Sequence, residues 1–223
     1  LFCPDEPGLP KSYLAEEPGA MRALQAGFDP YRQVRSRLET LAANGHATEK
    51  VELLVLGGSW SSYPADYQEW FLRRCFAALN GREAPDLAAA LALNAHARHR
   101  NVGLVLETRP DLLTPAEVAR LRRQGATKVQ VGAQSLDEEV RRRSGCGSGA
   151  EAVRRAVDRL RAAAFKVVLH WMPNLVGATP ASDLADFARL WEDPSLRPDE
   201  IKIYPCSLVA TAPLMALWRR GEW

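Results

Sequence analysis

Short apolar runs rich in β-branched residues alternate with longer amphipathic segments along the whole chain. Five of these runs are predicted to be strands, at 51–56, 102–106, 128–131, 166–170 and 200–204. Because the runs are almost continuously apolar, we expect them to be buried on both faces, as in a parallel sheet joined by helical crossovers. The alternation leaves two α/β architectures open, a doubly wound sheet and a (βα) barrel.

The segments between the strands carry helix signals. Helices are predicted at 19–44, 65–79, 86–99, 115–124, 137–143, 150–163, 181–191 and 212–219. Thr114 precedes Pro115 and Glu117, which is an N-cap followed by residues favoured in a first helical turn. Gly125 follows the same helix as a C-terminal stop. No change of composition marks a linker, so residues 1–223 are predicted to form one domain.

Composition excludes several classes of protein. The 223 residues are 47% hydrophobic and 25% charged, which is ordinary for a globular domain. No apolar run approaches the roughly 18 residues of a membrane span, and no secretory leader is recognisable. The four cysteines form no framework, which indicates a reducing compartment such as the cytoplasm. A net charge of +2 is too mild to indicate nucleic-acid binding by itself.

Each predicted strand ends in a polar, glycine or proline turn, where both architectures collect functional residues. Gly57 and Gly58 follow the first strand and would let a ligand approach the backbone, although a plain tight turn is the alternative. Glu107 and Arg109 follow the second strand as an acceptor and a cationic fork, and the alternative is a mutual salt bridge.

Other chemistry at these strand ends is weaker or missing. Gln134 and Ser135 add a neutral hydrogen-bonding pair after the third strand. His170 ends a buried strand, and a satisfied core histidine is the commoner explanation for such a position. The sequence contains no P-loop, no G-x-G-x-x-G after a strand and no Ser-His-Asp arrangement, which disfavours nucleotide hydrolysis, dinucleotide binding and serine hydrolysis.

A set of motifs spread over the whole chain resembles one family. The motifs are Cys3-Pro4, Lys50-Val51-Glu52, Gly57-Gly58-Ser59, Glu107-Thr108-Arg109-Pro110-Asp111 and Lys202-Ile203-Tyr204-Pro205. In this order they resemble the radical S-adenosylmethionine domain of the Elongator catalytic-subunit family, which modifies the wobble uridine of tRNA. The resemblance implies a partial (βα)6 TIM-like barrel of the radical SAM type.

The resemblance also implies a cluster loop and a second domain. Cys3 matches the last of three cysteines that hold a 4Fe-4S cluster, and its C-x-x-C partner would immediately precede Leu1. We therefore expect residues 1–223 to be a fragment, with a first strand and two cluster ligands upstream and an acetyltransferase-like domain downstream. Taken alone, this fragment is expected to hold no cluster and to be inactive.

The implied reaction is tRNA carboxymethyluridine synthesis. A radical derived from S-adenosylmethionine would activate the methyl group of acetyl-CoA, and the resulting carboxymethyl group would be joined to C5 of the wobble uridine. The implied cofactors are the 4Fe-4S cluster and S-adenosylmethionine, with acetyl-CoA as co-substrate. The implied partner is tRNA, with no membrane. A homodimer and Elongator-type partner subunits are both left open.

Individual residues take roles by the same resemblance. Gly57, Gly58 and Ser59 match the turn that receives the methionine amino group. Residues Glu107, Arg109, Gln134 and Ser135 match the rim around the adenosyl portion. Lys50 matches a lysine assigned to acetyl-CoA, with a surface lysine as the alternative. The candidates for tRNA phosphates are Lys11, Arg22, Lys166 and Lys202. No catalytic residue is identified.

Departures from the family pattern leave two other functions open. Asp5-Glu6 stands where relatives usually have Gly-Gly, and Ala210-Thr211-Ala212 stands where they usually have Arg-Gly-Thr. These changes put the acyl donor and the affinity for tRNA in question. One alternative is a radical S-adenosylmethionine enzyme with another acyl donor or substrate. The other is a non-catalytic RNA-binding scaffold with a degenerate cluster loop.

Overall fold

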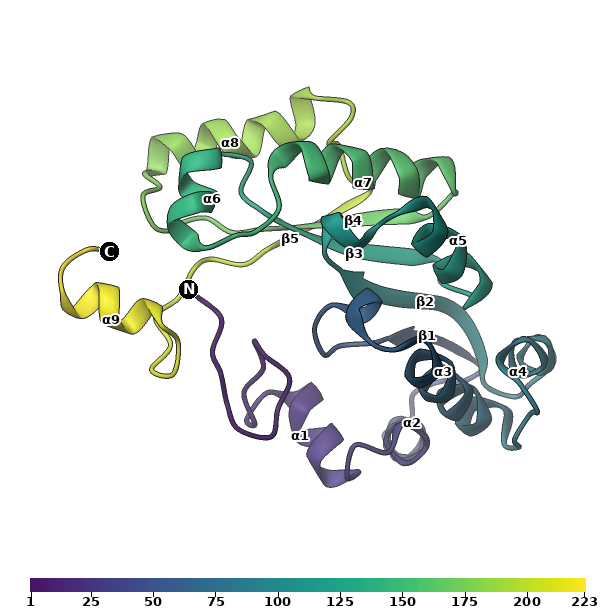
Figure 1. Ribbon diagram of the computed structural model, residues 1–223. Helices are drawn as coiled ribbons and strands as arrows, with labels where there is room; N and C mark the ends of the chain where they lie inside the picture. The colour runs from purple at the N-terminus through teal and green to yellow at the C-terminus, as the bar shows by residue number, and fades with distance from the viewer.

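Five parallel strands form one sheet in a computed structural model that describes residues 1–223. The strands are β1 (Lys50–Leu54), β2 (Arg100–Thr108), β3 (Lys128–Gln134), β4 (Lys166–Trp171) and β5 (Glu200–Ile203). Each strand pairs with the next one along the chain, and the sheet curls into a half-barrel (Figure 1). A doubly wound sheet reverses its strand order at a switch point, and this sheet does not. The prediction of a partial barrel is therefore confirmed.

Nine helices connect or flank these strands. They are α1 (Pro18–Gln25), α2 (Pro30–Ala43), α3 (Ala65–Asn80), α4 (Leu87–Asn94), α5 (Pro115–Arg123), α6 (Glu138–Ser144), α7 (Ala150–Ala162), α8 (Pro180–Glu192) and α9 (Leu214–Arg219). In Figure 1, α5 to α8 cover one side of the sheet, and the N-terminal segment with α1 lies on the other side. The amide of Leu214 donates to the carbonyl oxygen of Leu1 at 3.0 Å, so the N-terminus lies beside α9.

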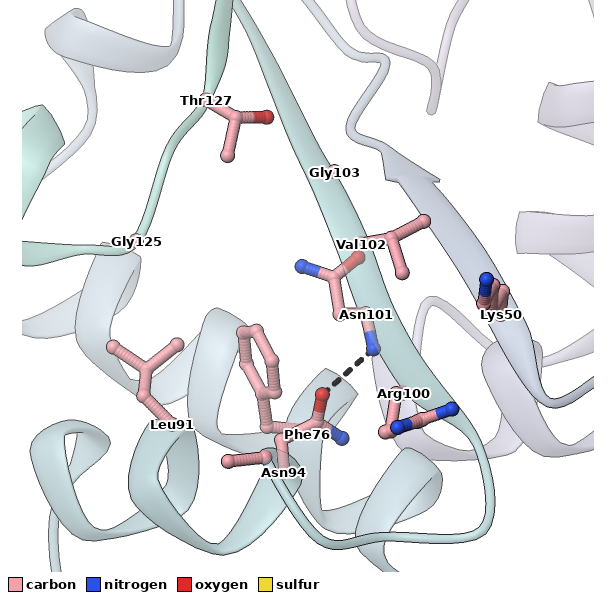
Figure 2. Close-up of a pocket in the computed structure, with 11 residues that line it drawn as sticks. Lys50, Phe76, Leu91, Asn94, Arg100, Asn101, Val102, Gly103, Gly125 and Thr127 are labelled. Carbon is pink, nitrogen blue, oxygen red and sulfur yellow. Dashed lines mark hydrogen bonds between the residues drawn. The ribbon is translucent and has the colours of Figure 1, made fainter.

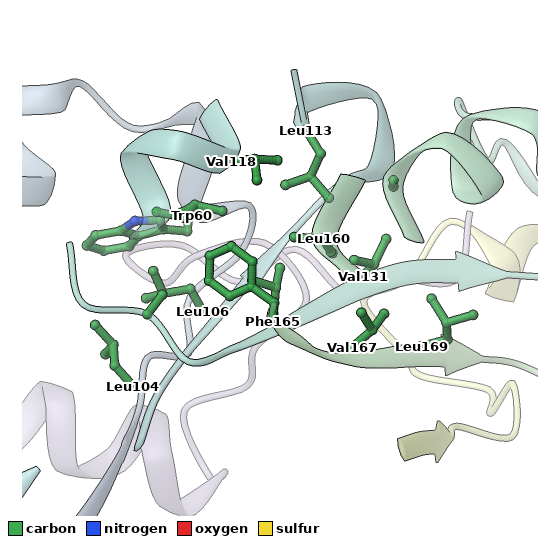
Figure 3. Packing of buried hydrophobic residues seen from close by; sticks show 14 of the residues in the cluster. Trp60, Leu104, Leu106, Leu113, Val118, Val131, Leu160, Phe165, Val167 and Leu169 are labelled. Atoms are coloured by element: carbon green, nitrogen blue, oxygen red, sulfur yellow. The ribbon is translucent and has the colours of Figure 1, made fainter. Parts of the chain in front are cut away.

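The main core lies between the sheet and the helices α3, α4, α5, α7 and α8. Residues that alternate along each strand, such as Leu106, Val131 and Leu169, are fully buried and pack against Leu160 of α7 and Phe165 (Figure 3). Burying one such side chain stabilises the fold by about 1.5–3 kcal/mol. The residues between them point to the concave face of the half-barrel, because side chains alternate along a strand.

The helix predicted over 19–44 is wrong in one respect, because the structure has two helices there. Gly27 and Phe28 adopt left-handed conformations with φ of +62° and +57°, and the chain reverses between α1 and α2. The Asp29 carboxylate then accepts hydrogen bonds from the amides of Tyr31 and Arg32 at 2.8 and 3.2 Å. Pro30 cannot continue a helix because it has no N–H, so it starts the second one.

The other predicted elements agree with the structure to within a few residues, except that α4 ends at Asn94, well before the predicted limit. The Thr114 hydroxyl accepts from the Glu117 amide at 3.2 Å, which confirms the predicted N-cap of α5. None of the helices has both the length and the apolar character needed to cross a membrane.

Candidate active site

The N-terminal segment meets the carboxyl ends of β1 and β2 through the side chain of Tyr13. Burial, together with the nearby Glu107 carboxylate, raises the pKa of Tyr13 to about 12, and a hydrogen bond to the Gly57 backbone acts in the opposite direction. Tyr13 therefore lies close to both the turn after β1 and the end of β2. We call the surface formed by Tyr13, Gly57, Gly58 and Glu107 the mouth.

Gly57 and Gly58 form a turn that other residues adopt only with strain. Their φ angles are +136° and +92°, and a Cβ at Gly58 would meet no atom within 4 Å. The turn thus requires glycine because of its backbone conformation, and not because neighbouring atoms would clash with a side chain. Its outer side is open, so a ligand can approach the backbone there. The half-buried Ser59 follows and accepts a hydrogen bond from the Ser62 hydroxyl through its carbonyl oxygen, at 2.6 Å.

A buried ring of hydrogen bonds anchors the segment that follows this turn. Trp60 donates from Nε1 to Gln124 at 3.0 Å, and Gln124 donates to the Gln68 side chain at 2.8 Å. Gln68 closes the ring by donating to the carbonyl oxygens of Trp60 and Tyr63 at 3.0 and 2.9 Å. Gln68 is fully buried in α3. The core thereby fixes the turn that forms one side of the mouth.

Four polar side chains from consecutive strands share the concave face of the sheet. They are Glu107 of β2, Gln130 of β3, His170 of β4 and Lys202 of β5, and we call them the lumenal quartet. The Gln130 side-chain oxygen lies 2.8 Å from Lys202 Nζ and 2.9 Å from His170 Nε2. His170 Nδ1 lies 3.7 Å from Glu107 Oε1.

Burial governs the charge states within the lumenal quartet. Burial, together with the nearby Lys202 ammonium, lowers the pKa of His170 to about 4, so the imidazole is neutral near pH 7. Burial also raises the pKa of Glu107, which the same ammonium partly opposes. The Tyr204 ring packs at 60° to the His170 ring with the centroids 5.1 Å apart. Gln130, His170 and Tyr204 were not selected as site residues from the sequence, although the position of Gln130 between Val129 and Val131 could have marked this face.

Arg109 does not pair with Glu107. Its side chain is exposed and binds Asp111 through two nitrogens, with Nε 3.0 Å from Oδ1. Hydrogen bonding from Arg109 lowers the pKa of Asp111 to about 2. The mutual salt bridge between Glu107 and Arg109 that the sequence left open is therefore absent, and Glu107 alone turns into the half-barrel.

Gln134 and Ser135 lie at an irregular end of β3. The pairing with β4 shifts register between Gly132 and Gln134, and Gln134 has a left-handed φ of +56°. The Ser135 hydroxyl donates to Asp186 of α8 at 3.2 Å and accepts from the Asp137 amide at 3.1 Å. Ser135 is buried and joins the bulge to α6 and α8, so its hydroxyl is occupied within the protein.

The predicted lysines and Arg22 do not form one surface. Lys50 and Lys166 begin β1 and β4, at the end of the sheet opposite the mouth, and Lys166 lies 3.3 Å from Asp199. Lys202 lies inside the half-barrel, bonded to Gln130. Lys11 is exposed in the N-terminal segment, and Arg22 is half-buried in α1. Only Lys11 and Arg22 belong to the N-terminal part of the chain that borders the mouth.

The protein has two surface cavities with a volume of about 500 Å³ each. One lies at the amino ends of the strands, with Lys50, Asn94 and Arg100 among the residues that line it (Figure 2). Asn94 accepts there from the Asn101 amide at 2.7 Å. The other is mostly apolar and runs from Tyr13 and the Gly57-Gly58 turn under α1 and α2. The second cavity adjoins the mouth.

The chain is similar in sequence to proteins of the Radical SAM superfamily. The model of the Radical SAM superfamily matches residues 21–190. The tRNA uridine(34) acetyltransferase of Methanocaldococcus infernus is 38% identical over 230 residues, which covers 100% of this chain and 43% of that protein. Elongator complex protein 3 of Danio rerio is 33% identical over 228 residues, which covers 42% of that protein. The chain thus spans less than half the length of these relatives.

Solved structures agree with the sequence comparisons. An archaeal Elp3 from Methanocaldococcus infernus with an N-terminal deletion superposes with a TM-score of 0.88 at 37% identity, over 90% of this chain and 47% of that one. Coproporphyrinogen III oxidase from Escherichia coli, a radical SAM enzyme, superposes with a TM-score of 0.56 at 18% identity, which shows a shared fold. The resemblance to the Elongator catalytic-subunit family is confirmed.

Proposed function

This chain belongs to the radical SAM superfamily, and from that premise we propose that it is the S-adenosylmethionine-binding barrel of an enzyme that carboxymethylates C5 of the tRNA wobble uridine. Relatives named for the modification of that uridine support the choice of substrate. The observation that carries the proposal is the meeting of the N-terminal segment, the Gly57-Gly58 turn and Glu107 at one mouth.

The mouth fits S-adenosylmethionine by the chemistry of its groups. The open backbone at Gly57, Gly58 and Ser59 would receive the methionine amino group, since no side chain blocks the turn. Glu107 would accept from the adenosyl portion, with Arg109 and Gln134 at the rim. Ser135 would contribute by supporting the bulge that carries Gln134.

The 4Fe-4S cluster would be held by cysteine thiolates, and Cys3 is the residue of this chain that we propose for it. Cys3 is half-buried in the N-terminal segment. Burial raises the pKa values of Cys146 and Cys206, the latter to about 11, which disfavours their thiolates as ligands. No group of three or more His, Cys, Asp or Glu side chains in the chain could hold a metal ion, so Cys3 would be one ligand of a larger set. When bound, the cluster supplies the electron that cleaves S-adenosylmethionine.

The positions of the basic residues refine their proposed roles. Lys50 stands beside Arg100 at the amino-end cavity, where two cations could bind the phosphates of acetyl-CoA. Lys11 and Arg22 are the stronger candidates for tRNA phosphates, because Lys166 is paired with Asp199 and Lys202 with Gln130. We place the enzyme in the cytoplasm and leave a homodimer or Elongator-type subunits as its assembly.

Mass spectrometry of tRNA tests the proposed function. The full-length protein, reconstituted with iron and sulfide without oxygen, would be incubated with S-adenosylmethionine, a reductant, acetyl-CoA and unmodified tRNA. We expect 5-carboxymethyluridine at the wobble position and its loss in a Cys3→Ala variant. Unmodified tRNA, together with turnover on another substrate, would show that the reaction differs.

A further inference from the structure

The hydrogen bonds of Gln130 fix the orientation of its side-chain amide. A lysine ammonium has donors only, so the group that faces Lys202 Nζ at 2.8 Å is the amide oxygen. The same oxygen lies 2.9 Å from His170 Nε2. An amide oxygen accepts but does not donate, and therefore His170 must carry its proton on Nε2.

This tautomer leaves a lone pair on His170 Nδ1, on the side of the ring that faces Glu107. The distance of 3.7 Å from Nδ1 to Glu107 Oε1 is too long for a hydrogen bond. A neutral imidazole nitrogen and an ionised carboxylate are both acceptors, so neither satisfies the other. A hydroxyl placed between them has one hydrogen, which both acceptors would share in a three-centre hydrogen bond.

We propose that Lys202 and Gln130 are positioning residues that hold His170 as the Nε2–H tautomer, so that His170 Nδ1 and the Glu107 carboxylate together accept a ribose hydroxyl of a nucleoside ligand. The proposal rests on the proposed function, in which both the adenosyl group of S-adenosylmethionine and the tRNA nucleoside carry such hydroxyls. The acetyl group of acetyl-CoA has no donor and does not match two acceptors.

The surroundings of the two acceptors suit a ligand from the mouth. The Glu107 side chain keeps 27% of its surface exposed, whereas that of His170 keeps 9%. The groups that face the pair are Tyr13 from the N-terminal segment, Tyr204 after β5 and the Lys202 ammonium. A hydroxyl that enters beside Glu107 would thus reach Nδ1 at the inner end of the site.

The first test reads the tautomer directly. Full-length protein labelled with 15N at its histidine rings would be studied by NMR at pH 7, and a His170→Asn variant would identify the signals of His170. We expect a protonated Nε2 and a bare Nδ1 in the parent protein. Substitution of Gln130→Leu should produce a mixture of tautomers. A proton on Nδ1 in the parent protein, or no change in the Gln130→Leu variant, would overturn the positioning role.

The second test measures binding without turnover. Calorimetry would compare S-adenosylhomocysteine with its 2′-deoxy and 3′-deoxy analogues, and an anticodon stem-loop with one that carries 2′-deoxyuridine at the wobble position. We expect one ribose form to bind about tenfold or more tightly than its deoxy analogue, the effect of one hydrogen bond to a charged acceptor. The His170→Phe variant should lose this preference and retain the affinity for the deoxy ligand.

The exposed His96 provides the matched control, because His96→Phe should leave every affinity unchanged. Loss of the preference in the S-adenosylhomocysteine series identifies the adenosyl ribose as the ligand, and loss in the stem-loop series identifies the tRNA nucleoside. An unchanged preference in both series would refute the inference. Because no turnover is required, this result is independent of whether the wobble uridine becomes modified.

Discussion

The hydroxyl of Tyr63 donates to the carbonyl oxygen of Gly57 at 2.6 Å and closes the turn that follows β1. Tyr63 is itself fixed by Gln68 of α3, so the backbone proposed to receive the methionine amino group is connected to the core by two hydrogen bonds in series. This arrangement makes the geometry of the turn testable by small substitutions away from the ligand.

Removal of the Tyr63 hydroxyl should loosen the turn. We expect Tyr63→Phe to cost about 1 kcal/mol of unfolding free energy, the net value of one hydrogen bond. The affinity for S-adenosylhomocysteine should fall severalfold, because the Gly57 carbonyl is no longer held. Chemical denaturation and calorimetry measure the two effects, and an unchanged affinity would show that the turn does not depend on Tyr63.

Alanine at Gly58 should separate ligand binding from backbone strain. With φ at +92°, Gly58→Ala should cost about 1–2 kcal/mol and weaken binding of S-adenosylhomocysteine. Gly45 is the matched control, since it also has a left-handed φ, of +80°, and open space around it. Gly45→Ala should destabilise the protein similarly in denaturation experiments but bind normally. Equal loss of binding in both variants would mean that lowered stability alone explains the effect.

The buried amide ring should be costly to break. Gln68→Leu leaves Gln124 and two carbonyl oxygens without partners inside the core, so we expect a loss of about 3 kcal/mol of unfolding free energy. Gln25→Leu on the exposed surface of α1 is the control and should change stability little. If thermal denaturation ranks the two variants equally, the ring does not anchor the turn.

His170 should make the protein less stable in mild acid. Its folded pKa of about 4 lies below the ordinary value of 6.5, so between these values the unfolded chain binds more protons and stability falls as the pH is lowered. The loss attributable to His170 at pH 5 is about 2 kcal/mol. Glu107 acts oppositely, because its raised pKa favours the folded state at low pH and this contribution is lost as the pH rises.

A His170→Gln variant separates the contribution of His170 to the pH dependence of stability from that of Glu107. The variant and the parent protein both contain Glu107, so any difference between them is due to His170. Urea denaturation at pH 7 and pH 5 should show a smaller loss of stability in the variant. Identical pH dependence in the two proteins would mean that His170 is not kept neutral by burial.

The alternation of strands and helices predicted a parallel sheet with helical crossovers, because hydrophobic periodicity depends on local sequence. The choice of a partial barrel over a doubly wound sheet came from the family resemblance. The break between α1 and α2 was missed, although Asp29-Pro30 carried the signal of a capped helix start. Within the site, Gly57, Gly58 and Glu107 are found together at the mouth, as expected for residues at the carboxyl ends of neighbouring strands. These features follow from the order of residues along single strands.

Contacts between strands were harder to foresee. The sequence left open a salt bridge between Glu107 and Arg109, but Arg109 pairs with Asp111, and this pairing depends on the loop that follows β2. The position of Lys202 beside Gln130 and His170 depends on the register of three strands, which no motif in the sequence specifies. A lysine predicted for tRNA phosphates therefore belongs to the lumenal quartet.

Isotope transfer tests the central claim most directly. The reconstituted full-length protein would receive acetyl-CoA with a trideuterated acetyl methyl group, S-adenosylmethionine, a reductant and unmodified tRNA. We predict that mass spectrometry finds one deuterium in 5′-deoxyadenosine and two in the carboxymethyl group on the wobble uridine. Formation of 5′-deoxyadenosine without deuterium, with the uridine unmodified, would contradict the assignment of this chain to that reaction.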